Sequence, residues 1–407
     1  MELKKYKLGD LCTFINGRAY LQPELQNSGK YKIVRVGNLS GGNNSWYYSD
    51  MELEPTKYCA KGDLLYAWAC NFGPYIWKGD KTIYHYHIWK VINSEQIDKM
   101  YLYYLLKFMT NSFMGCVHGS TMLHITKENM ESMEVRIHAS IEEQRRIATI
   151  LNKLDCKIGL NRQINDNLEA MAKQLYDYWF VQFDFPNEEG KPYKSSGGAM
   201  VWNEKLKREI PQGWHCYELN KWLEIKSGFA FKSETYISKG KFKVVTIKNV
   251  QDHHLDTSSC DYVYEIPQGM KEWCSLSVND RLISLTGNCG RLCIVTEKDL
   301  LLNQRVGLLA CNDEYIDYAY LLLSSEEYQT LSNNLAKGAA QANLSPVDLC
   351  KNIAVLPKLD VLEKFNRQIK PIVASYIQNE IQIADLTKQR DELLPLLMNG
   401  QASVNSD

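Results

Sequence analysis

The chain repeats itself at a distance of about half its length. The segment LGDLCTFINGRAY, which starts at Leu8, matches LNKWLEIKSGFAF, which starts at Leu219, at an offset of 211 residues. Segments that start at Tyr31 and Phe242 match at the same offset. Solenoid repeats span about 20 to 50 residues, so a repeat this long indicates a duplicated domain. Positions identical in the two copies include Gly17/Gly228, Ala19/Ala230, Lys32/Lys243, Val34/Val245 and Asn38/Asn249.

Each copy contains short apolar runs separated by glycine, asparagine and aspartate, which is the pattern of short strands joined by loops. Matches continue at larger offsets, from Lys61 against Val278 and from Gly119 against Gly338. We therefore expect two pseudo-symmetric, mixed α/β domains, which makes the fold class α+β. Predicted strands lie at 31–36, 64–68, 83–91, 242–247 and 282–285, and predicted short helices at 100–108 and 315–323.

The periodicity becomes helical after each of these domains. Seam positions then recur at alternating steps of four and three residues, which is a strong coiled-coil signal. The two seams could each pack on their own domain, but their equivalent places in the repeat favour pairing with each other. The first seam consists of Ile147, Leu151, Leu154, Ile158, Asn161, Asn165, Leu168, Ala172, Leu175 and Trp179. The second consists of Phe365, Ile369, Ile372, Tyr376, Asn379, Ile383, Leu386, Arg390, Leu393 and Leu397.

A few residues modify this helical pattern. Polar seam residues such as Asn165 lower stability but fix register and partner, so they predict a specified pairing. Pro371 is expected to kink the second helix or to mark where its regular part starts, and Pro395 to bend or end its last turn. Between the copies, the segment 183–214 is rich in proline, glycine and serine and is expected to be a connector. The first helix would be roughly 50 Å long, more than one turn of DNA at roughly 34 Å.

Composition limits the compartment and the class of partner. The twelve cysteines of the 407 residues form no CxxC pair. Cys289 and Cys293 have no histidine near them in the sequence, so we expect no zinc site and reduced thiols. The first ten residues lack a signal-peptide core and no apolar run reaches the roughly 20 residues of a membrane span, so we expect a cytoplasmic protein. The net charge of −1 argues against a general polyanion binder but permits a locally basic groove.

The sequence carries no recognisable catalytic motif. The segments GNLSGGNN and GDKT, at 37–44 and 79–82, do not fit the GxxxxGK(S/T) pattern of a P-loop. Neither GxSxG nor HExxH occurs, nor does the Asn/Asp-Pro-Pro-aromatic tetrapeptide of amino-group DNA methyltransferases. Asp63 and Asp280, the clearest acidic pair shared by the copies, are expected in turns. We interpret the chain as a binding protein without catalytic or metal-ligating residues.

Three segments resemble the specificity subunit of type I restriction-modification enzymes. GSTMLHITKENMESMEVRIHASIEEQRRIATIL, at 119–151, resembles the family's segment that leads into its first long helix. WFVQFDFPNEEGKPYKSSGGAMVWNEKLKREIPQGW, at 179–214, is similar to its central connector. QRDELLPLLMNGQASV, at 389–404, is similar to its C-terminal signature. The resemblance covers nearly the whole chain.

The sequence departs from the family at two places. His138 and Ala139 stand where the family often has a proline pair. The segment 339–340 is an alanine pair where the first copy has Ser120 and Thr121. These departures leave the position of the junction between strand and helix open.

The resemblance implies a non-catalytic chain with two target-recognition domains, each reading one half of an asymmetric, bipartite DNA sequence. It implies that the two long helices form an antiparallel coiled coil, set the spacing and dock two methyltransferase subunits. Those subunits would use S-adenosylmethionine and added restriction subunits would use ATP, so this chain is expected to bind no cofactor. The implied boundaries are 1–140 and 214–359 for the recognition domains, 141–181 and 360–399 for the helices, 182–213 for the connector and 400–407 for a tail.

Candidate DNA contacts are polar side chains in matching loops of the two copies, because such groups read base edges and hold phosphates. Matched positions such as His87 and Arg305 differ in chemistry, as two different half-sites require. In the first domain the candidates are Arg18, Tyr20, Arg35, Asn38, Asn71, His85, His87, His118, Ser120, Thr121 and His124. In the second they are Lys232, Thr246, Lys248, Asn249, Thr286, Asn288, Asn303, Gln304, Arg305, Lys337, Gln341 and Asn343.

Some of these residues also have a plainer interpretation. Asn38 and Asn249 are identical in the two copies and suit a turn-forming or phosphate-holding role better than base reading. His85 and His87 would alternate on one face of the predicted strand 83–91 and could simply be half-buried there. Two other functions stay open: a stand-alone enzyme with unrecognised active residues, and a coiled-coil adaptor that does not touch DNA.

Overall fold

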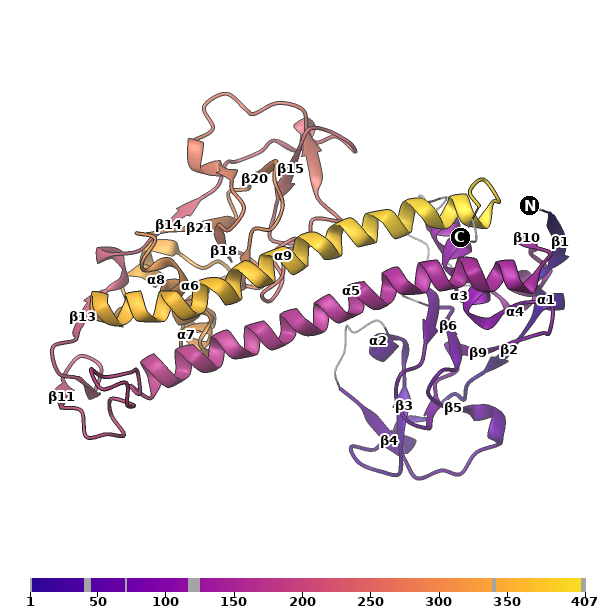
Figure 1. Cartoon of the computed structure of the whole chain (residues 1–407), viewed down its shortest axis with the longest axis horizontal. Helices are drawn as coiled ribbons and strands as arrows, with labels where there is room; N and C mark the ends of the chain where they lie inside the picture. Colours follow the sequence, from indigo (N-terminus) through magenta and orange to yellow (C-terminus); the bar gives the residue numbers. More distant parts are fainter. Residues whose placement is uncertain (1, 40–44, 70–71, 116–124, 339–341, 404–407) are drawn as a thin grey trace. The chain divides into compact units, whose positions relative to one another are not determined.

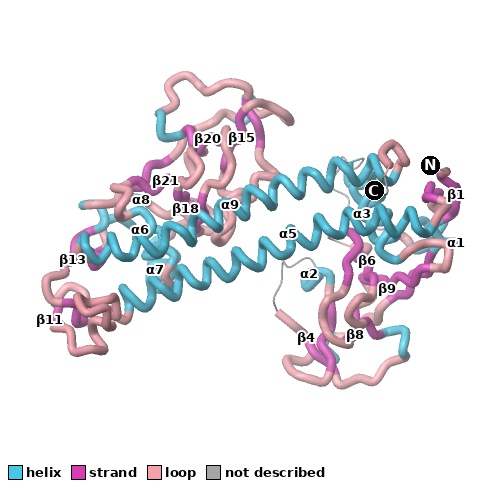
Figure 2. The backbone as a smooth tube through the Cα atoms, in the orientation of Figure 1, coloured by secondary structure: helices cyan, strands magenta, loops and turns pink. Residues whose placement is uncertain are grey.

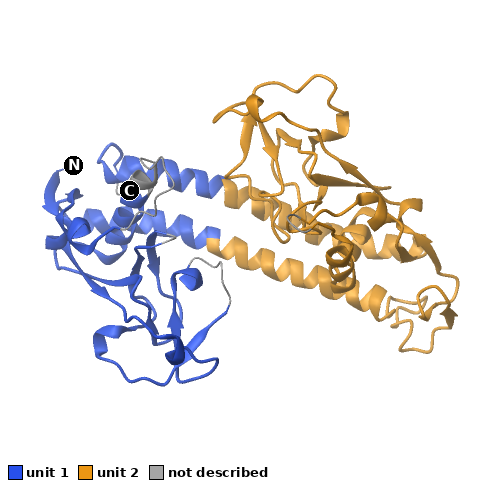
Figure 3. Cartoon of the chain, turned by 180° about the vertical axis from the view of Figure 1, so that it is seen from behind, with its two compact units in different colours: residues 1–158, 385–407 blue, residues 159–384 orange. Residues whose placement is uncertain are grey.

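The computed structural model describes residues 2–39, 45–69, 72–115, 125–338 and 342–403. The chain forms two compact units, one of Met1–Ile158 with Asp385–Asp407 and the other of Gly159–Ala384 (Figure 3). Each unit therefore combines one globular domain with a section of each long helix. Figure 1 labels the elements along the chain, and Figure 2 distinguishes helices, strands and loops.

In the first unit, short strands and helices precede the long helix. The strands are β1 (Leu3–Lys7), β2 (Cys12–Asn16), β3 (Tyr31–Val34), β4 (Tyr47–Ser49), β5 (Tyr58–Cys59), β6 (Leu64–Ala67), β7 (Gly73–Ile76), β8 (Thr82–Tyr84), β9 (Ile88–Asn93) and β10 (Glu134–His138). The helices are α1 (Leu8–Leu11), α2 (Val36–Leu39), α3 (Lys99–Gly115) and α4 (Lys127–Ser132), with short 3-10 turns η1 (Gln22–Glu24) and η2 (Pro55–Lys57).

Within the described residues, two four-stranded sheets form the body of this domain. One has the strand order β2-β9-β6-β7 and the other β4-β3-β8-β5, in which β3 and β8 run parallel. β1 pairs with β10 separately. The core lies between the first sheet and α3, where Trp89 stacks on Tyr66 at 6.0 Å and meets the edge of Phe14 at 5.2 Å. Large aromatic side chains of this kind contribute much of the apolar area that a small domain buries.

The second unit repeats this topology. Its sheets have the orders β14-β21-β18-β19 and β16-β15-β20-β17, with β15 and β20 parallel and β13 paired with β22. Strand for strand this is the order of the first unit, so the predicted duplication of a mixed α/β domain is confirmed. The strands are β13 (His215–Glu218), β14 (Glu224–Ser227), β15 (Phe242–Val245), β16 (Asp261–Val263), β17 (Ser275–Leu276), β18 (Arg281–Ser284), β19 (Leu292–Ile294), β20 (Leu300–Leu302), β21 (Val306–Ala310) and β22 (Ile353–Leu356). The helices are α6 (Ile316–Ser324), α7 (Glu326–Leu335) and α8 (Pro346–Cys350), with 3-10 turns η4 (Leu219–Lys221), η5 (Ser233–Thr235) and η6 (Glu272–Cys274).

The two long helices are α5 (Ile141–Tyr176), which continues into a π-helical turn η3 (Asp177–Val181), and α9 (Leu359–Met398). In the second unit Asn161 donates a hydrogen bond to Gln382 (3.2 Å). Asn165, one turn later in α5, bonds to Glu380 and Tyr376, which come earlier in α9 than Gln382. The two helices therefore pair antiparallel. This pairing confirms the predicted coiled coil and excludes two helices that each pack only on their own domain.

The seam follows the predicted heptads, because every seam position is buried or half-buried. Its polar members are paired: Asn379 donates to the side-chain amide oxygen Oδ1 of Asn165 at 2.9 Å, and the Asn165 amide N–H donates to the Glu380 carboxylate at 2.7 Å. In the first unit Arg390 forms an ion pair with Asp155 at 2.8 Å. Such bonds favour one register, since a shifted pairing would leave buried amides without partners.

Neither Pro371 nor Pro395 interrupts α9. The helix begins at Leu359 and runs through Pro371, so the expectation that this proline marks the start of the regular part is wrong. Pro371 has no N–H to donate to the carbonyl O of Arg367, one turn earlier. Both residues lie on the exposed side of the helix, where water can bind that carbonyl group. The helix ends at Met398, within one turn of Pro395.

The connector is ordered rather than a loose linker. It folds back as a hairpin of β11 (Met200–Asn203) and β12 (Arg208–Pro211), and it contributes buried aromatic rings to the core of the second unit. Phe185 stacks on Trp214 at 4.9 Å and on Tyr193 at 4.7 Å. This packing fixes the route by which the chain enters the second domain.

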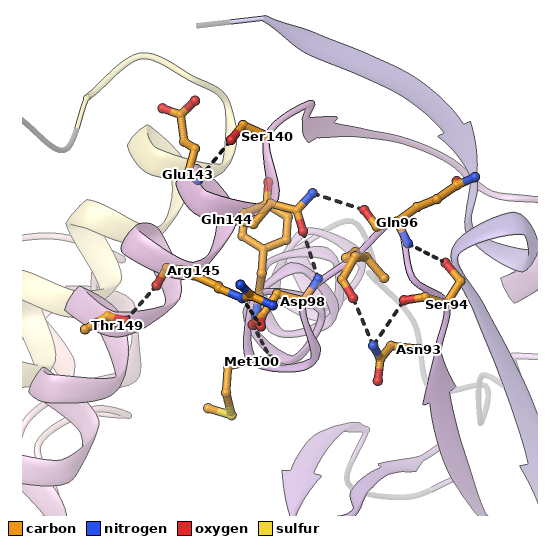
Figure 4. A network of polar contacts seen from close by, with 12 residues as sticks. Asn93, Ser94, Gln96, Asp98, Met100, Ser140, Glu143, Gln144, Arg145 and Thr149 are labelled. Carbon is orange, nitrogen blue, oxygen red and sulfur yellow. Dashed lines mark hydrogen bonds and ion pairs between the residues drawn. The ribbon is translucent and has the colours of Figure 1, made fainter.

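A polar network anchors the start of α5 to the first domain (Figure 4). Gln144 accepts a hydrogen bond from the backbone N–H of Asp98 (2.9 Å) and donates to the carbonyl O of His138 (2.8 Å). Ser140 accepts from the N–H of Glu143 (3.4 Å) and so caps the helix. The junction that the sequence left open is therefore the two residues between β10 and α5.

Candidate nucleic-acid interface

In each domain the chain crosses closely over a strand of the second sheet. Gly17 follows β2, and a Cβ atom there would lie 2.3 Å from the carbonyl O of Tyr84. Gly228 follows β14, and a Cβ atom there would lie 2.3 Å from the carbonyl O of Leu302. Both distances are far below a van der Waals contact, so only glycine fits. The residues beyond the two crossings are therefore positioned in the same way.

The strand that is crossed, β8 or β20, ends in a turn that both domains hold with matching backbone hydrogen bonds. This turn comprises residues 85–87 in the first domain and 303–305 in the second. In the first domain the bonds are His85 N to Val34 O (2.9 Å), Tyr86 N to Arg18 O (3.0 Å) and Ile88 N to His85 O (3.0 Å). In the second they are Asn303 N to Val245 O (3.0 Å), Gln304 N to Phe229 O (2.9 Å) and Val306 N to Asn303 O (2.9 Å). The same backbone thus presents His-Tyr-His in one domain and Asn-Gln-Arg in the other.

This turn corrects the predicted strand 83–91. The segment forms β8, the turn and β9, so His85 and His87 do not alternate on one strand face. They belong instead to a half-buried aromatic group with Tyr86 and Trp68, in which the His87 and Trp68 rings lie 5.1 Å apart. Trp68 donates from its indole N–H to the carbonyl O of Tyr86 at 2.8 Å. We did not select Tyr86 or Trp68 from the sequence, although an aromatic residue directly after a strand was a usable signal.

Burial sets the charge of this aromatic group. Burial, together with charge repulsion from the neighbouring His87 and Arg35, lowers the pKa of His85 to about 4. His85 is therefore neutral near pH 7 and brings no positive charge to a phosphate. Its chemistry at neutral pH is that of a hydrogen-bonding aromatic ring.

The two arginines predicted in the first domain are engaged by neighbouring side chains. Arg18 forms a two-pronged ion pair with Glu24, with N–O distances of 2.7 and 3.1 Å, and lies over the ring of Tyr20 at 5.2 Å. Arg35 lies over the ring of Tyr47 at 4.3 Å. The Arg18 guanidinium can bind a DNA base only if its ion pair with Glu24 breaks first. Glu24 therefore fixes the position of Arg18 in the absence of DNA.

Asn38 and Asn249 form the same turn in the two domains. Asn38 accepts a hydrogen bond from the N–H of Arg35 at 3.0 Å, and Asn249 accepts one from the N–H of Thr246 at 2.8 Å. Asn249 is 1% exposed and also donates to the carbonyl O of Asp256 at 2.9 Å. The turn-forming role considered from the sequence is therefore confirmed for both.

In the second domain the candidate segments converge on the turn 303–305. Backbone hydrogen bonds join Leu285 N to Arg305 O (3.0 Å), Leu344 N to Leu285 O (2.8 Å) and Gly287 N to Ala342 O (2.9 Å). Thr286 is buried and donates to the Asn343 side chain at 2.9 Å, and Asn303 is buried as well, so both support the surface rather than form it. The exposed candidates are Lys232, Lys248, Asn288, Gln304, Arg305, Lys337 and Asn343.

Six predicted contact residues lie outside the described residues, and their prediction stands untested: Asn71, His118, Ser120, Thr121, His124 and Gln341. In the part of the chain that is described, no group of three or more His, Cys, Asp or Glu side chains is arranged to hold a metal ion. No helix in that part is long and apolar enough to cross a membrane. Burial raises the pKa of the Cys59 thiol to about 12, which keeps it protonated and unreactive near pH 7.

The comparisons with known proteins agree with this architecture. The family described as type I restriction modification DNA specificity domain matches residues 1–170 and 211–389. Two specificity subunits from Methanocaldococcus jannaschii are similar in sequence. That of the type I restriction enzyme MjaIX is 29% identical over 77% of this chain and 71% of its own length. That of MjaVIII is 27% identical over 98% of this chain and 93% of its own length.

A solved structure shares the fold. The S subunit of a type I restriction-modification system from M. genitalium matches with a TM-score of 0.58 at 17% sequence identity. The match covers 100% of this chain and 97% of that one. Together with the duplicated domains and the antiparallel helices, the family match leads to one conclusion. The chain belongs to the family of type I restriction modification DNA specificity domains.

Proposed function

We propose that this chain is the DNA sequence-recognition subunit of a type I restriction-modification complex, and that each domain reads one half of an asymmetric, bipartite site. One observation carries the proposal. The two domains share strand order, crossing glycines and backbone bonds, while the turn at 85–87 and 303–305 changes its side chains completely. Base pairs are distinguished by the donors and acceptors that meet them in the major groove, so one scaffold with two different tips suits two different half-sites.

The remaining parts of the complex follow from this role. We propose that α5 and α9 set the spacing between the half-sites and dock two methyltransferase subunits, which bring S-adenosylmethionine. Restriction subunits that use ATP join the full complex, and this chain binds no cofactor and performs no catalytic step. Among the described residues the cysteines are free thiols, which supports a reducing compartment, the cytoplasm.

Exchange of a recognition domain tests the two-reader proposal. Residues 1–140 are replaced by the corresponding domain of a relative, and the sequence methylated by the assembled complex is read by methylome sequencing. We expect one half of the methylated site to change and the other half to stay. The matched control replaces residues 214–359, which should change the other half only. If either exchange changed both halves, or neither, the two-reader proposal would be wrong.

The salt dependence of DNA binding separates this function from a coiled-coil adaptor. Each phosphate contact releases counterions, so the logarithm of the affinity should fall by about 0.9 per contact for each tenfold rise in salt. Fluorescence anisotropy of the assembled complex with a labelled duplex measures this slope. An adaptor predicts no salt-dependent binding at all. A stand-alone enzyme predicts methyl transfer from S-adenosylmethionine by the purified chain, which we expect to be absent.

A further inference from the structure

A cavity of about 260 Å³ lies within the second unit, against the paired section of α5 and α9. Its walls come from these two helices, from α6 and from the loop that contains His253. Three tyrosines line it: Tyr176, Tyr320 and Tyr376. Much of the remaining wall is aliphatic and includes Ile372. The cavity is therefore an apolar chamber with several aromatic rings.

Carboxylates dominate the charge of this chamber. Glu169 and Asp166 both come from α5 and both line the cavity. Within the described residues, no hydrogen bond or ion pair of Glu169 is found. Burial, together with the negative charges of Asp166 and Glu380, raises the pKa of Glu169 to about 7. Asp317 also lines the cavity, but Arg281 compensates its charge with an N–O distance of 2.6 Å.

His253 forms part of the cavity wall, and Tyr376 and Tyr320 hold it in place. His253 has a φ of 60°, in the left-handed region that residues with side chains seldom adopt. It is held there because its carbonyl O accepts a hydrogen bond from the Tyr376 hydroxyl at 2.6 Å, and its Nδ1 lies 3.3 Å from the Tyr320 hydroxyl. Burial lowers the pKa of His253, so its ring adds no positive charge at neutral pH.

We propose that this cavity binds an organic cation, an ammonium group carried on a short apolar or aromatic body. The ammonium pairs with Glu169 and Asp166, and three of the residues that line the cavity are tyrosines, whose aromatic rings attract cations. Lys173 and Asp177 also line the cavity and contribute one charge of each sign, so the net charge of the wall stays negative. The proposal goes beyond the proposed function, because it holds whether or not the domains read DNA.

Calorimetric titration of the full chain with 2-phenylethylamine tests the proposal. We expect the amine to bind. The uncharged analogue 2-phenylethanol should bind at least about tenfold more weakly, because the alcohol cannot form the charged pair. Glu169→Gln should weaken amine binding by a similar factor at pH 8. The matched control is Glu265→Gln, an exposed residue of the same unit that should leave binding unchanged. Equal binding of amine and alcohol, or no binding of the amine, would overturn the proposal.

The pH dependence of amine binding provides a second readout. The amine stays charged up to about pH 10, while Glu169 ionises near pH 7, so affinity should rise between pH 6 and pH 8. His254, which pairs with Glu380 at 3.2 Å and has a pKa raised chiefly by that hydrogen bond, is a second titratable group near the site. Glu169→Gln separates the two, because a rise that persists unchanged in this variant would contradict the role of Glu169. The charged and titratable groups that face the site are Asp166 and Lys173 from α5, Asp177 from η3, Asp317 from α6, Glu380 from α9, and His253 and His254 from the loop.

The ammonium group that the cavity binds can come from two sources, a free amine or the lysine side chain of a protein docked on the helices. Repeating the amine titration on the complex assembled with its methyltransferase subunits distinguishes them. Binding that persists assigns the site to a free amine. Binding that is lost on assembly assigns it to a lysine of the docked subunit, and in that case Glu169→Gln should also weaken assembly.

Discussion

At the scale of single residues, one asparagine closes the same turn in each domain. Asn249 accepts hydrogen bonds from both the N–H and the hydroxyl of Thr246, and it donates to the carbonyl O of Asp256. Asn38 makes the equivalent bond to the N–H of Arg35. Identical residues in the two copies thus hold the loop, and the residues that differ, such as His87 and Arg305, are presented by it.

Replacing Asn249 with alanine should therefore destabilise the second unit without any DNA present. The change leaves the N–H of Thr246 and the carbonyl O of Asp256 unpaired in a buried place, at a cost of about 1 to 3 kcal/mol. Urea unfolding followed by circular dichroism measures the loss. Asn334→Ala, at an exposed position on α7, is the matched control and should change stability by about 0.5 kcal/mol or less. A loss for Asn249→Ala no larger than that of the control would contradict its structural role.

Individual contact residues were harder to predict than the scaffold. The sequence pairs His87 with Arg305, and the matched turns confirm that equivalence. It could not show that Arg18 is ion-paired with Glu24, since that contact depends on how the loop between them folds. Trp68 and Tyr86 escaped selection because aromatic side chains are as common in cores as at surfaces. Which base edge any of them meets depends on the pose of the DNA, which residue type alone does not encode.

At the scale of elements, the heptad pattern predicted the long helices better than local propensity did. A proline inside a helix costs about 3 kcal/mol, which made Pro371 a natural boundary. Burying side chains such as Ile369 and Tyr376 contributes about 1.5 to 3 kcal/mol each, so a long buried seam outweighs one proline. The strand predicted at 83–91 failed for a different reason. Its aromatic and aliphatic residues are typical of a single strand, whereas the turn within it is held by the bond from Ile88 N to His85 O and by long-range bonds to Val34 and Arg18.

The seam of α5 can be tested with two leucines of the same helix. Leu151 is completely buried, whereas Leu160 is 56% exposed on the opposite side of the seam. Leu151→Ala should lower the free energy of unfolding by about 2 to 5 kcal/mol, because it removes buried methyl groups and leaves a cavity. Leu160→Ala should cost about 1 kcal/mol or less. Guanidinium unfolding of both variants decides the matter, and equal losses would place Leu151 outside a packed seam.

At the scale of the whole molecule, each compact unit is assembled from segments far apart in the chain. The core of the first unit includes Leu394, Leu397 and Met398 from the end of α9, packed with Ile147 and Leu151 from the start of α5. The repeat predicted two domains, and the seams predicted paired helices. Periodicity alone did not show that the end of the second helix completes the core of the first domain, because it does not identify which domain a helix end packs against.

A substitution near the end of α9 should therefore weaken the unit that contains residues 1–158. Leu397 is 3% exposed in that core, so Leu397→Ala should cost about 2 to 5 kcal/mol. Leu396, its neighbour, is 41% exposed, and Leu396→Ala is the control, with a loss of about 1 kcal/mol or less. Amide hydrogen exchange locates the effect. Faster exchange in the second unit, with the first unit unchanged, would contradict the assignment.

This arrangement has a consequence for synthesis on the ribosome. Ile147 and Leu151 emerge long before Leu394 and Leu397, the leucines that cover them. At about 5 to 20 residues per second, the interval is on the order of ten seconds or more. Throughout that time the nascent polypeptide exposes apolar side chains that the end of α9 later buries. The first domain therefore completes its native packing only after α9 has been translated, and chaperones can bind it in the interval.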